Sequence, residues 1–96
     1  MYLGVLHLEF TLHGNSSLKE KRNVARSIKQ KLRNKFNVAV AEVEALDNHA
    51  RLVLAAVTIG NERAHVEGRL TKALNMVEAV STEELTDSHV EIFAAE

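Results

Sequence analysis

The sequence predicts an α+β sandwich in which two helices cover one face of a four-stranded antiparallel sheet. Four short segments alternate apolar and polar residues or are continuously apolar, as strands are, and two longer segments repeat apolar residues every three or four positions, as amphipathic helices do. Their order along the chain is strand, helix, strand, strand, helix, strand. With 96 residues, of which 46% are hydrophobic, the chain is expected to form a single domain, residues 1–96, with its own core.

The first strand is predicted over residues 2–12, where apolar and polar side chains alternate with a period of two. Such a strand has one face in the core and a polar face outside. We expect Leu6, Leu8, Phe10 and Leu12 on the inner face and Val5, His7, Glu9 and Thr11 on the outer face.

A long amphipathic helix is predicted from Ser17 to Phe36. Ser17 followed by Glu20 is a capping box, in which the hydroxyl and the carboxylate satisfy free backbone donors of the first turn. At about 100° per residue, an apolar stripe faces the core, with basic side chains beside it and uncharged polar ones, Asn23, Ser27, Gln30 and Asn34, further round. The apolar stripe is Leu18, Val24, Ala25, Ile28, Leu32 and Phe36, and the basic stripe is Lys19, Arg22, Arg26, Lys29 and Arg33.

Charge is distributed very unevenly along the chain. The segment from Ser17 to Phe36 holds eight basic residues and one acid, a formal charge of +7, whereas the remainder holds four basic residues and twelve acids, a charge of −8. The total charge of −1 therefore hides a strongly dipolar molecule.

The remaining elements follow from similar patterns. A second strand is predicted over residues 38–46, with Ala41 and Val43 facing one way and Glu42 and Glu44 the other. Residues 47–49 read as a turn, and residues 51–59 are apolar on both sides, as a central strand is. A second helix is predicted over residues 62–80, with Asn61 as its cap, followed by a short strand over residues 89–93. The buried stripe of this second helix is expected to be Val66, Leu70, Ala73, Leu74 and Val77.

This order of elements favours the split βαβ, or ferredoxin-like, sandwich with spatial strand order 4-1-3-2. Both helices then cover the same side of the sheet. The other side, which we call the open face, is left without cover of its own. We expect it to carry Val5, His7, Glu9, Thr11, Glu42, Glu44, His89, Glu91 and Phe93.

Four stretches of the chain resemble one known family. They are GVLHLEFTLHG at 4–14, SLKEKR at 17–22, FNVAVAEVE at 36–44 and NERAHVE at 61–67. Together they resemble the YlxP-like family of small bacterial proteins, a domain of unknown function. The resemblance implies a ferredoxin-like fold and a gene neighbourhood among translation and ribosome-maturation factors. It implies no activity and no catalytic residues. Residues 17–22 therefore serve only to recognise the family and carry no functional role over to this chain.

The basic stripe is the first candidate for function. Lysine and arginine side chains that neutralise phosphates give affinity for nucleic acid without reading its sequence. We therefore predict that Lys19, Arg22, Arg26, Lys29 and Arg33 contact structured RNA or a ribosomal particle. The alternative is a solvated helix face whose charge the acidic remainder balances. One Tyr and three Phe leave too few aromatic rings for recognition of single strands by stacking.

The open face is the second candidate. Here the alternative prediction is a homo-oligomeric interaction protein that is joined through this face, at Val5, His7, Glu9, His89, Glu91 and Phe93, and that acts on a protein partner. If the first and last strands are neighbours, two imidazoles and two carboxylates share this face and could bind a divalent metal such as zinc. The register of the strands decides this, and side chains without a metal are the expectation.

Other classes of function find little support. Ser16 and Ser17 are explained by capping rather than as nucleophiles, and no phosphate-binding loop or dinucleotide fingerprint is present. The sequence therefore predicts a protein without enzymatic activity and without a cofactor. The chain has no cysteine and no secretory signal or membrane span, so we expect a cytoplasmic protein that does not contact a membrane.

Overall fold

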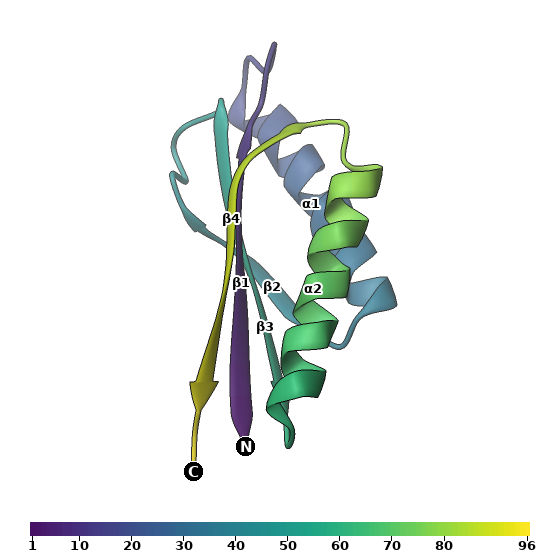
Figure 1. Ribbon diagram of the computed structural model, residues 1–96. Helices are drawn as coiled ribbons and strands as arrows, with labels where there is room; N and C mark the ends of the chain where they lie inside the picture. Colours follow the sequence, from purple (N-terminus) through teal and green to yellow (C-terminus); the bar gives the residue numbers. More distant parts are fainter.

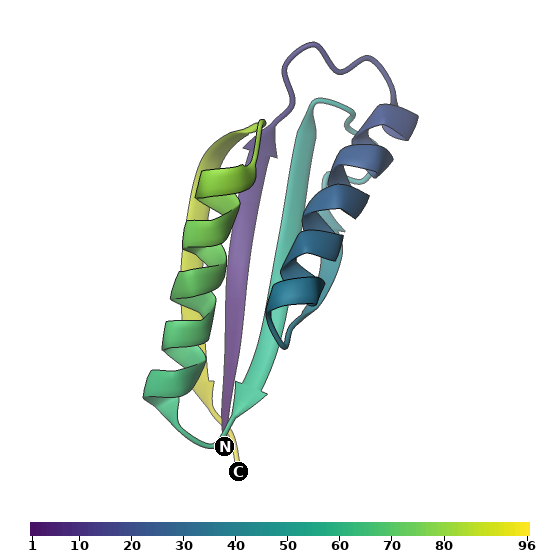
Figure 2. The ribbon, with the colours of Figure 1, turned by 90° about the vertical axis from the view of Figure 1, so that its right-hand side faces the viewer.

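The computed structural model describes residues 1–96 and contains one sheet and two helices (Figure 1). All strand pairs are antiparallel, in the order β2-β3-β1-β4, which is the predicted order read from the other edge. Both helices lie on the same side of the sheet, with α2 over β1 and β4 and α1 over β2 and β3 (Figure 2). The predicted ferredoxin-like fold is confirmed. The elements are β1 (Tyr2–Thr11), α1 (Leu18–Lys35), β2 (Ala39–Glu44), β3 (Arg51–Gly60), α2 (Arg63–Val80) and β4 (Glu84–Ala94).

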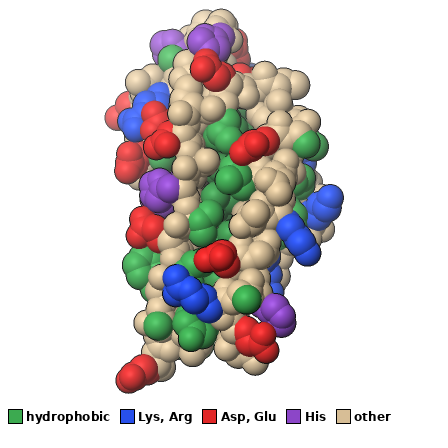
Figure 3. Space-filling view, in the orientation of Figure 1, with side chains coloured by type: hydrophobic (Ala, Val, Ile, Leu, Met, Phe, Trp, Pro, Cys, Tyr) green, Lys and Arg blue, Asp and Glu red, His purple; other side chains and the backbone are tan.

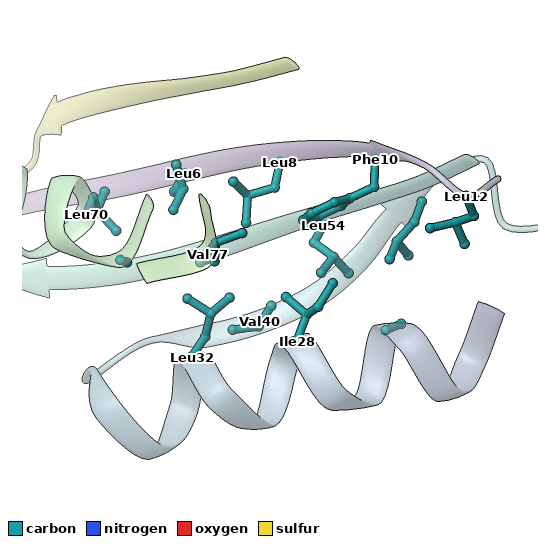
Figure 4. Close-up of a cluster of buried hydrophobic side chains, with 14 residues drawn as sticks. Leu6, Leu8, Phe10, Leu12, Ile28, Leu32, Val40, Leu54, Leu70 and Val77 are labelled. Carbon is teal, nitrogen blue, oxygen red and sulfur yellow. The ribbon is translucent and has the colours of Figure 1, made fainter. Parts of the chain in front are cut away.

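The core lies between the sheet and the helices and is centred on β1. Leu6, Leu8 and Phe10 are fully buried on the inner face of β1, as the alternation predicts. They face Leu32 of α1 and Leu70 of α2, among other apolar side chains (Figure 4). Full burial of a Leu or Phe side chain stabilises a fold by about 1.5–3 kcal/mol. The central strand therefore supplies a large share of the stabilising burial.

The core is less completely covered at the β4 edge. Leu85, Val90 and Ile92 of β4 pack against the core but stay partly exposed. In the space-filling view, hydrophobic side chains are visible along the seam between β4 and α2 (Figure 3). The edge strand β4 therefore packs less completely against the core than β1 does.

Glycine allows α2 to approach the sheet closely at the N-terminal end of the helix. A Cβ atom built on Gly4 of β1 would lie 2.6 Å from side-chain atoms of both Leu70 and Val66, and one on Gly60 would lie 2.9 Å from Val66. Gly68 within α2 is different, because nothing lies within 4 Å of its would-be Cβ. The expected cost of a helical glycine, about 1 kcal/mol relative to alanine, is therefore not offset by packing there.

The helix starts are only partly as predicted. Ser17 caps α1, and its Oγ accepts a hydrogen bond from the Glu20 N–H at 3.1 Å. The Glu20 carboxylate accepts from the N–H and the hydroxyl of Ser16, both at 3.1 Å, rather than from the N–H of Ser17. The prediction that Asn61 caps α2 is wrong. The cap residue is Glu62, whose side chain makes no capping hydrogen bond.

Lys21, one of the eight basic residues of α1, is buried rather than at the surface. Its side chain is 2% exposed and lies 2.7 Å from Glu42 Oε2 on β2. Its Nζ also donates to the carbonyls of Ala45 at 2.8 Å, Leu46 at 3.3 Å and Arg51 at 3.3 Å. The sequence contained a signal for this. Lys21 falls in the middle of the apolar stripe, where a charge requires a buried partner.

The prediction that Glu42 lies on the open face is also wrong, because Glu42 is the buried partner of Lys21. Glu42 pairs with Leu54 of β3 and faces the helices, where Lys21 neutralises it. A register shift between Glu42 and Glu44 then reverses the phase of β2, so that Glu44 lies opposite Val53 on the open face as expected. A one-residue slip moves side chains to the other face of a sheet, and an alternating pattern does not reveal where a bulge causes one.

We predict that Lys21→Met lowers the free energy of unfolding by about 3 kcal/mol, because it leaves the Glu42 carboxylate without its counter-charge in a largely buried position. Urea denaturation followed by circular dichroism measures the change. Lys31→Met, on the exposed surface of the same helix, is the matched control and should change the stability little. The double variant Lys21→Met, Glu42→Leu should recover much of the loss. A single variant as stable as the control would contradict the role given to Lys21.

Candidate functional site

The basic stripe lies on the flank of α1 that borders the edge strand β2. Arg33 marks this side, because its Nη2 donates to the carbonyl of Val40 on β2 at 3.0 Å. Lys19, Arg22 and Arg26 are exposed, and Lys29 is partly exposed. No ion pair joins any of the five to a carboxylate. Arg22 and Arg33 are about 16 Å apart along the helix at 1.5 Å per residue. The stripe is therefore an extended row of cations without acidic partners.

The opposite flank of α1 also carries exposed lysines. At about 100° per residue, Lys31 is turned roughly 180° and Lys35 roughly 140° away from Arg22. Lys31 lines a hollow of about 290 Å³ with Val80 and Ser81, at the C-terminal end of α2. The two flanks thus face different surroundings, one the β2 edge and the other α2. Together, the basic residues of α1 other than Lys21 give the helix surface, with Glu20, a formal charge of +6.

The strand register divides the open face into rows that run across β3, β1 and β4. Two rows at one end are mostly apolar, and we call them the apolar end. Ile59, Val57 and Phe93 are 50%, 41% and 47% exposed there. The next row holds two histidines, and the rows beyond it are charged. In order, the rows are Ile59, Leu3 and Phe93; Val57, Val5 and Glu91; Ala55, His7 and His89; Val53, Glu9 and Asp87; and Arg51 and Thr11 with Glu84.

His7 and His89 stack on each other in the middle of the open face. They are direct cross-strand partners, with ring centroids 4.4 Å apart and ring planes inclined by 14°. Glu91 lies two residues beyond His89 on the same face, and its Oε1 is 3.3 Å from His89 Nε2. One ligand atom from each of these three residues lies within 4.8 Å of the others. We call this group the histidine cluster. It contains three of the four imidazole and carboxylate side chains that the sequence offered as possible metal ligands on this face.

The fourth residue, Glu9, is held by a different partner. Arg51 of β3 donates to both Glu9 oxygens, Nε at 2.8 Å and Nη2 at 3.1 Å, and also lies 3.6 Å from Glu44. These hydrogen bonds lower the pKa of Glu9 below its ordinary value of 4.5 and raise the pKa of Arg51. Glu9 is therefore fixed as an anion by Arg51 of β3 and is not one of the three grouped ligands.

Several open-face residues were not identified from the sequence. Leu3, Val57 and Ile59 complete the apolar end, and Arg51 and Asp87 belong to the charged rows. Residues 51–59 are apolar on both sides, so their pattern does not distinguish the inner face from the outer one. Only the pairing with β1 places the odd-numbered residues of β3 on the open face.

The fold and these surfaces define a small α+β protein of the ferredoxin-like class, with a basic helix and a half-apolar sheet face. Residues 3–90 match the model of a family described as a protein of unknown function, DUF503, and the chain belongs to this family. It is 29% identical over 91 residues to the uncharacterized protein YlxP of Bacillus subtilis (strain 168), covering 95% of this chain and 99% of that protein. The resemblance to the YlxP-like family is confirmed.

Comparison with solved structures gives more distant similarity. SnoaB, a cofactor-independent oxygenase from Streptomyces nogalater, is 17% identical with a TM-score of 0.47, over 98% of this chain and 92% of that chain. A putative antibiotic biosynthesis monooxygenase from Deinococcus radiodurans is 14% identical with a TM-score of 0.47, over 100% and 93% of the two chains. We draw no conclusion about activity from either. Neither helix of the present chain has the length and hydropathy needed to cross a membrane.

We predict that Glu9→Gln makes the stability less sensitive to acid. The pKa of Glu9 is lower in the folded protein than in the unfolded chain, so its ion pair with Arg51 stabilises the fold above the ordinary pKa of 4.5. This stabilisation is lost as the pH falls through the lower, folded-state pKa. Urea denaturation from about pH 6 to about pH 3 should therefore show a smaller decline for Glu9→Gln than for the unchanged protein. Glu44→Gln, at the longer contact with Arg51, should retain the full decline.

Proposed function

We propose that the protein is a non-enzymatic, cytoplasmic module that binds structured RNA, within a ribosome-assembly intermediate, through the basic stripe of α1. The observation that carries the proposal is the lack of acidic partners for Lys19, Arg22, Arg26, Lys29 and Arg33. A helix face whose charge were balanced within the molecule would form ion pairs with some of the twelve acids outside α1. The cations of the stripe are instead available to a polyanion.

The arrangement of the stripe suits the phosphate backbone of RNA. Cations spread over about 16 Å of helix can each neutralise a different phosphate and release its counterions. Asn23, Gln30 and Asn34 lie beside the stripe and are exposed, so their amides are available to sugar and phosphate oxygens. Such contacts recognise the shape of a folded RNA rather than its bases.

The open face restricts how RNA approaches. Its charged rows carry Glu9, Asp87 and Glu84 against Arg51, and Glu44 at the end of β2 and Glu91 beside the histidines add two more acids. This surplus of carboxylates repels a polyanion, whereas the stripe attracts it. The proposal therefore has the RNA bind along α1 and the β2 edge, with the open face turned away.

We predict that the protein binds ribosomal RNA and purified ribosomal subunits, and that Arg22→Glu, Arg26→Glu weakens this binding by about 100-fold, because two phosphate contacts are replaced by repulsion. Fluorescence anisotropy and co-sedimentation measure the affinity. For about four phosphate contacts, the affinity of the unchanged protein should fall about 100-fold between about 50 mM and about 200 mM salt. Arg33 is left in place because it also bonds to Val40.

The matched control is Lys31→Glu, Lys35→Glu, which makes the same change of net charge on the opposite flank of α1. It should retain most of the affinity and of the salt dependence. Equal losses in both double variants would mean that net charge, not the stripe, determines binding. Absence of binding at low salt would reject the proposal.

A second candidate function is homodimerisation through the open face, and the apolar end favours it. Phe93, Ile59 and Val57 expose large apolar side chains side by side with Leu3 and Val5. A two-fold axis across this face would place the apolar end of one copy against that of another, because such an interface is self-complementary. The predicted interface residues Val5, His7, Glu9, His89, Glu91 and Phe93 would lie within or beside that contact.

We predict that the protein sediments as a dimer at high micromolar concentration and that Ile59→Asp, Phe93→Asp converts it to a monomer, because each substitution places a charge in the apolar contact. Analytical ultracentrifugation measures the mass. The control Val43→Asp, Leu46→Asp changes two other exposed apolar residues, outside the apolar end. It should remain dimeric. A monomeric unchanged protein at that concentration would remove this candidate.

A further inference from the structure

We propose that His7, His89 and Glu91 bind one Zn²⁺ ion per chain on the open face. The proposal goes beyond RNA binding and depends neither on it nor on dimerisation. It also departs from the sequence-based expectation that these side chains hold no metal. The reason is the register, which sets the two imidazoles directly opposite each other and places a carboxylate beside them.

The distances within the histidine cluster are close to those of a zinc site. With bonds of about 2.0–2.2 Å, the ligand atoms around a tetrahedral zinc lie roughly 3.3 Å apart. His89 Nε2 and Glu91 Oε1 are already separated by 3.3 Å, and one ligand atom of each residue lies within 4.8 Å of the others. Tilting the two stacked rings so that their nitrogens converge closes the remaining gap. That movement needs only side-chain rotation, since the backbone already sets the residues side by side.

The donor set matches zinc. Neutral imidazole nitrogens and one carboxylate oxygen are ligands that zinc takes readily, and the chain has no thiolate to compete for it. Three protein ligands leave a fourth position for water or an anion. His89 and Glu91 have side chains 50% and 49% exposed, so solvent reaches that position.

The surroundings attract a cation and keep the ligands available. His7 and His89 line a hollow of about 210 Å³ together with Glu9, Glu44 and Asp87, whose carboxylates make the potential negative. Arg51 pairs with Glu9 and, at a longer distance, with Glu44, but its single charge balances only one of them, and it lies two rows away from the histidines. Asp87, in the row next to His89, has no ion pair. Of the two acids in the row next to the cluster, Asp87 is therefore uncompensated.

The chain also provides an internal control. His65 and Glu62 on α2 form an exposed pair with Nε2 and Oε2 3.5 Å apart, much like His89 and Glu91. No third possible ligand lies beside this pair. The histidine cluster is the one place in the molecule where three possible ligands come together. If an exposed histidine and glutamate were enough to hold zinc, both places would bind it. If the opposed second histidine is required, only the open face will.

The test is zinc titration of the tag-free protein by isothermal titration calorimetry, with a thermal melt at each zinc concentration. We expect one Zn²⁺ per chain and a melting temperature that rises with zinc, as binding to the folded state alone requires. His89→Gln and Glu91→Gln should each weaken binding by at least about tenfold, since each removes a direct ligand. His65→Gln should bind as tightly as the unchanged protein.

A second measurement reports the ligands directly. Co²⁺ in place of Zn²⁺ should give the visible absorption of a four-coordinate site, and His7→Gln should abolish it. The metal-free melting temperatures of the variants should match that of the unchanged protein, because all three side chains are at the surface or partly so. The proposal is overturned by absence of saturable binding up to about 1 mM zinc, by equal loss in His65→Gln, or by full affinity in the His89 and Glu91 variants.

Discussion

The buried ammonium group of Lys21 is the interaction on which the arrangement of α1, β2 and the following turn depends. It joins two carbonyls of the β2–β3 connection, the carbonyl of Arg51 at the start of β3 and the Glu42 carboxylate to α1. Ala45, one of its acceptors, has a φ of 56°, which is unfavourable for a residue with a Cβ, and its carbonyl also accepts from the Asn48 N–H at 3.0 Å. One cation therefore stabilises a strained turn and fixes the flank of α1 that borders β2.

Most of the fold follows from hydrophobic periodicity. Leu6, Leu8 and Phe10 alternate so regularly that their strand can face only one way, and the apolar stripe of α1 sets its rotation. Prediction failed where a polar contact overrides the pattern. Glu42 reads as an outward residue, but Lys21 offers it a counter-charge on the inner side. The start of α2 was predicted wrongly for a different reason: the helix begins at Arg63, one residue later than expected, so Glu62 rather than Asn61 occupies the cap position.

The candidate sites differ in how far they could be predicted. The basic stripe depends on one helix and its rotation, so the helical period alone placed Arg22 and Arg26 on a common exposed flank. The histidine cluster depends on the pairing of β1 with β4, which includes a register shift between Glu9 and Phe10 that no local pattern indicates. The capture of Glu9 by Arg51 likewise depends on pairing with β3. Contacts between distant strands are the part that periodicity does not specify.

The place of β1 in the sheet has a consequence for biosynthesis. This strand leaves the ribosome before the other three, yet Tyr2 pairs with Gly60 on one side and with Ala94 on the other. At about 5–20 residues per second, the nascent chain carries an apolar strand with unpaired edges for roughly 5 to 20 seconds before β4 is made. Pairing between segments so far apart in the sequence forms slowly, and the sheet is completed only after β4 has been translated. The nascent polypeptide therefore exposes one unpaired edge of an apolar strand until the last strand of the sheet has been made.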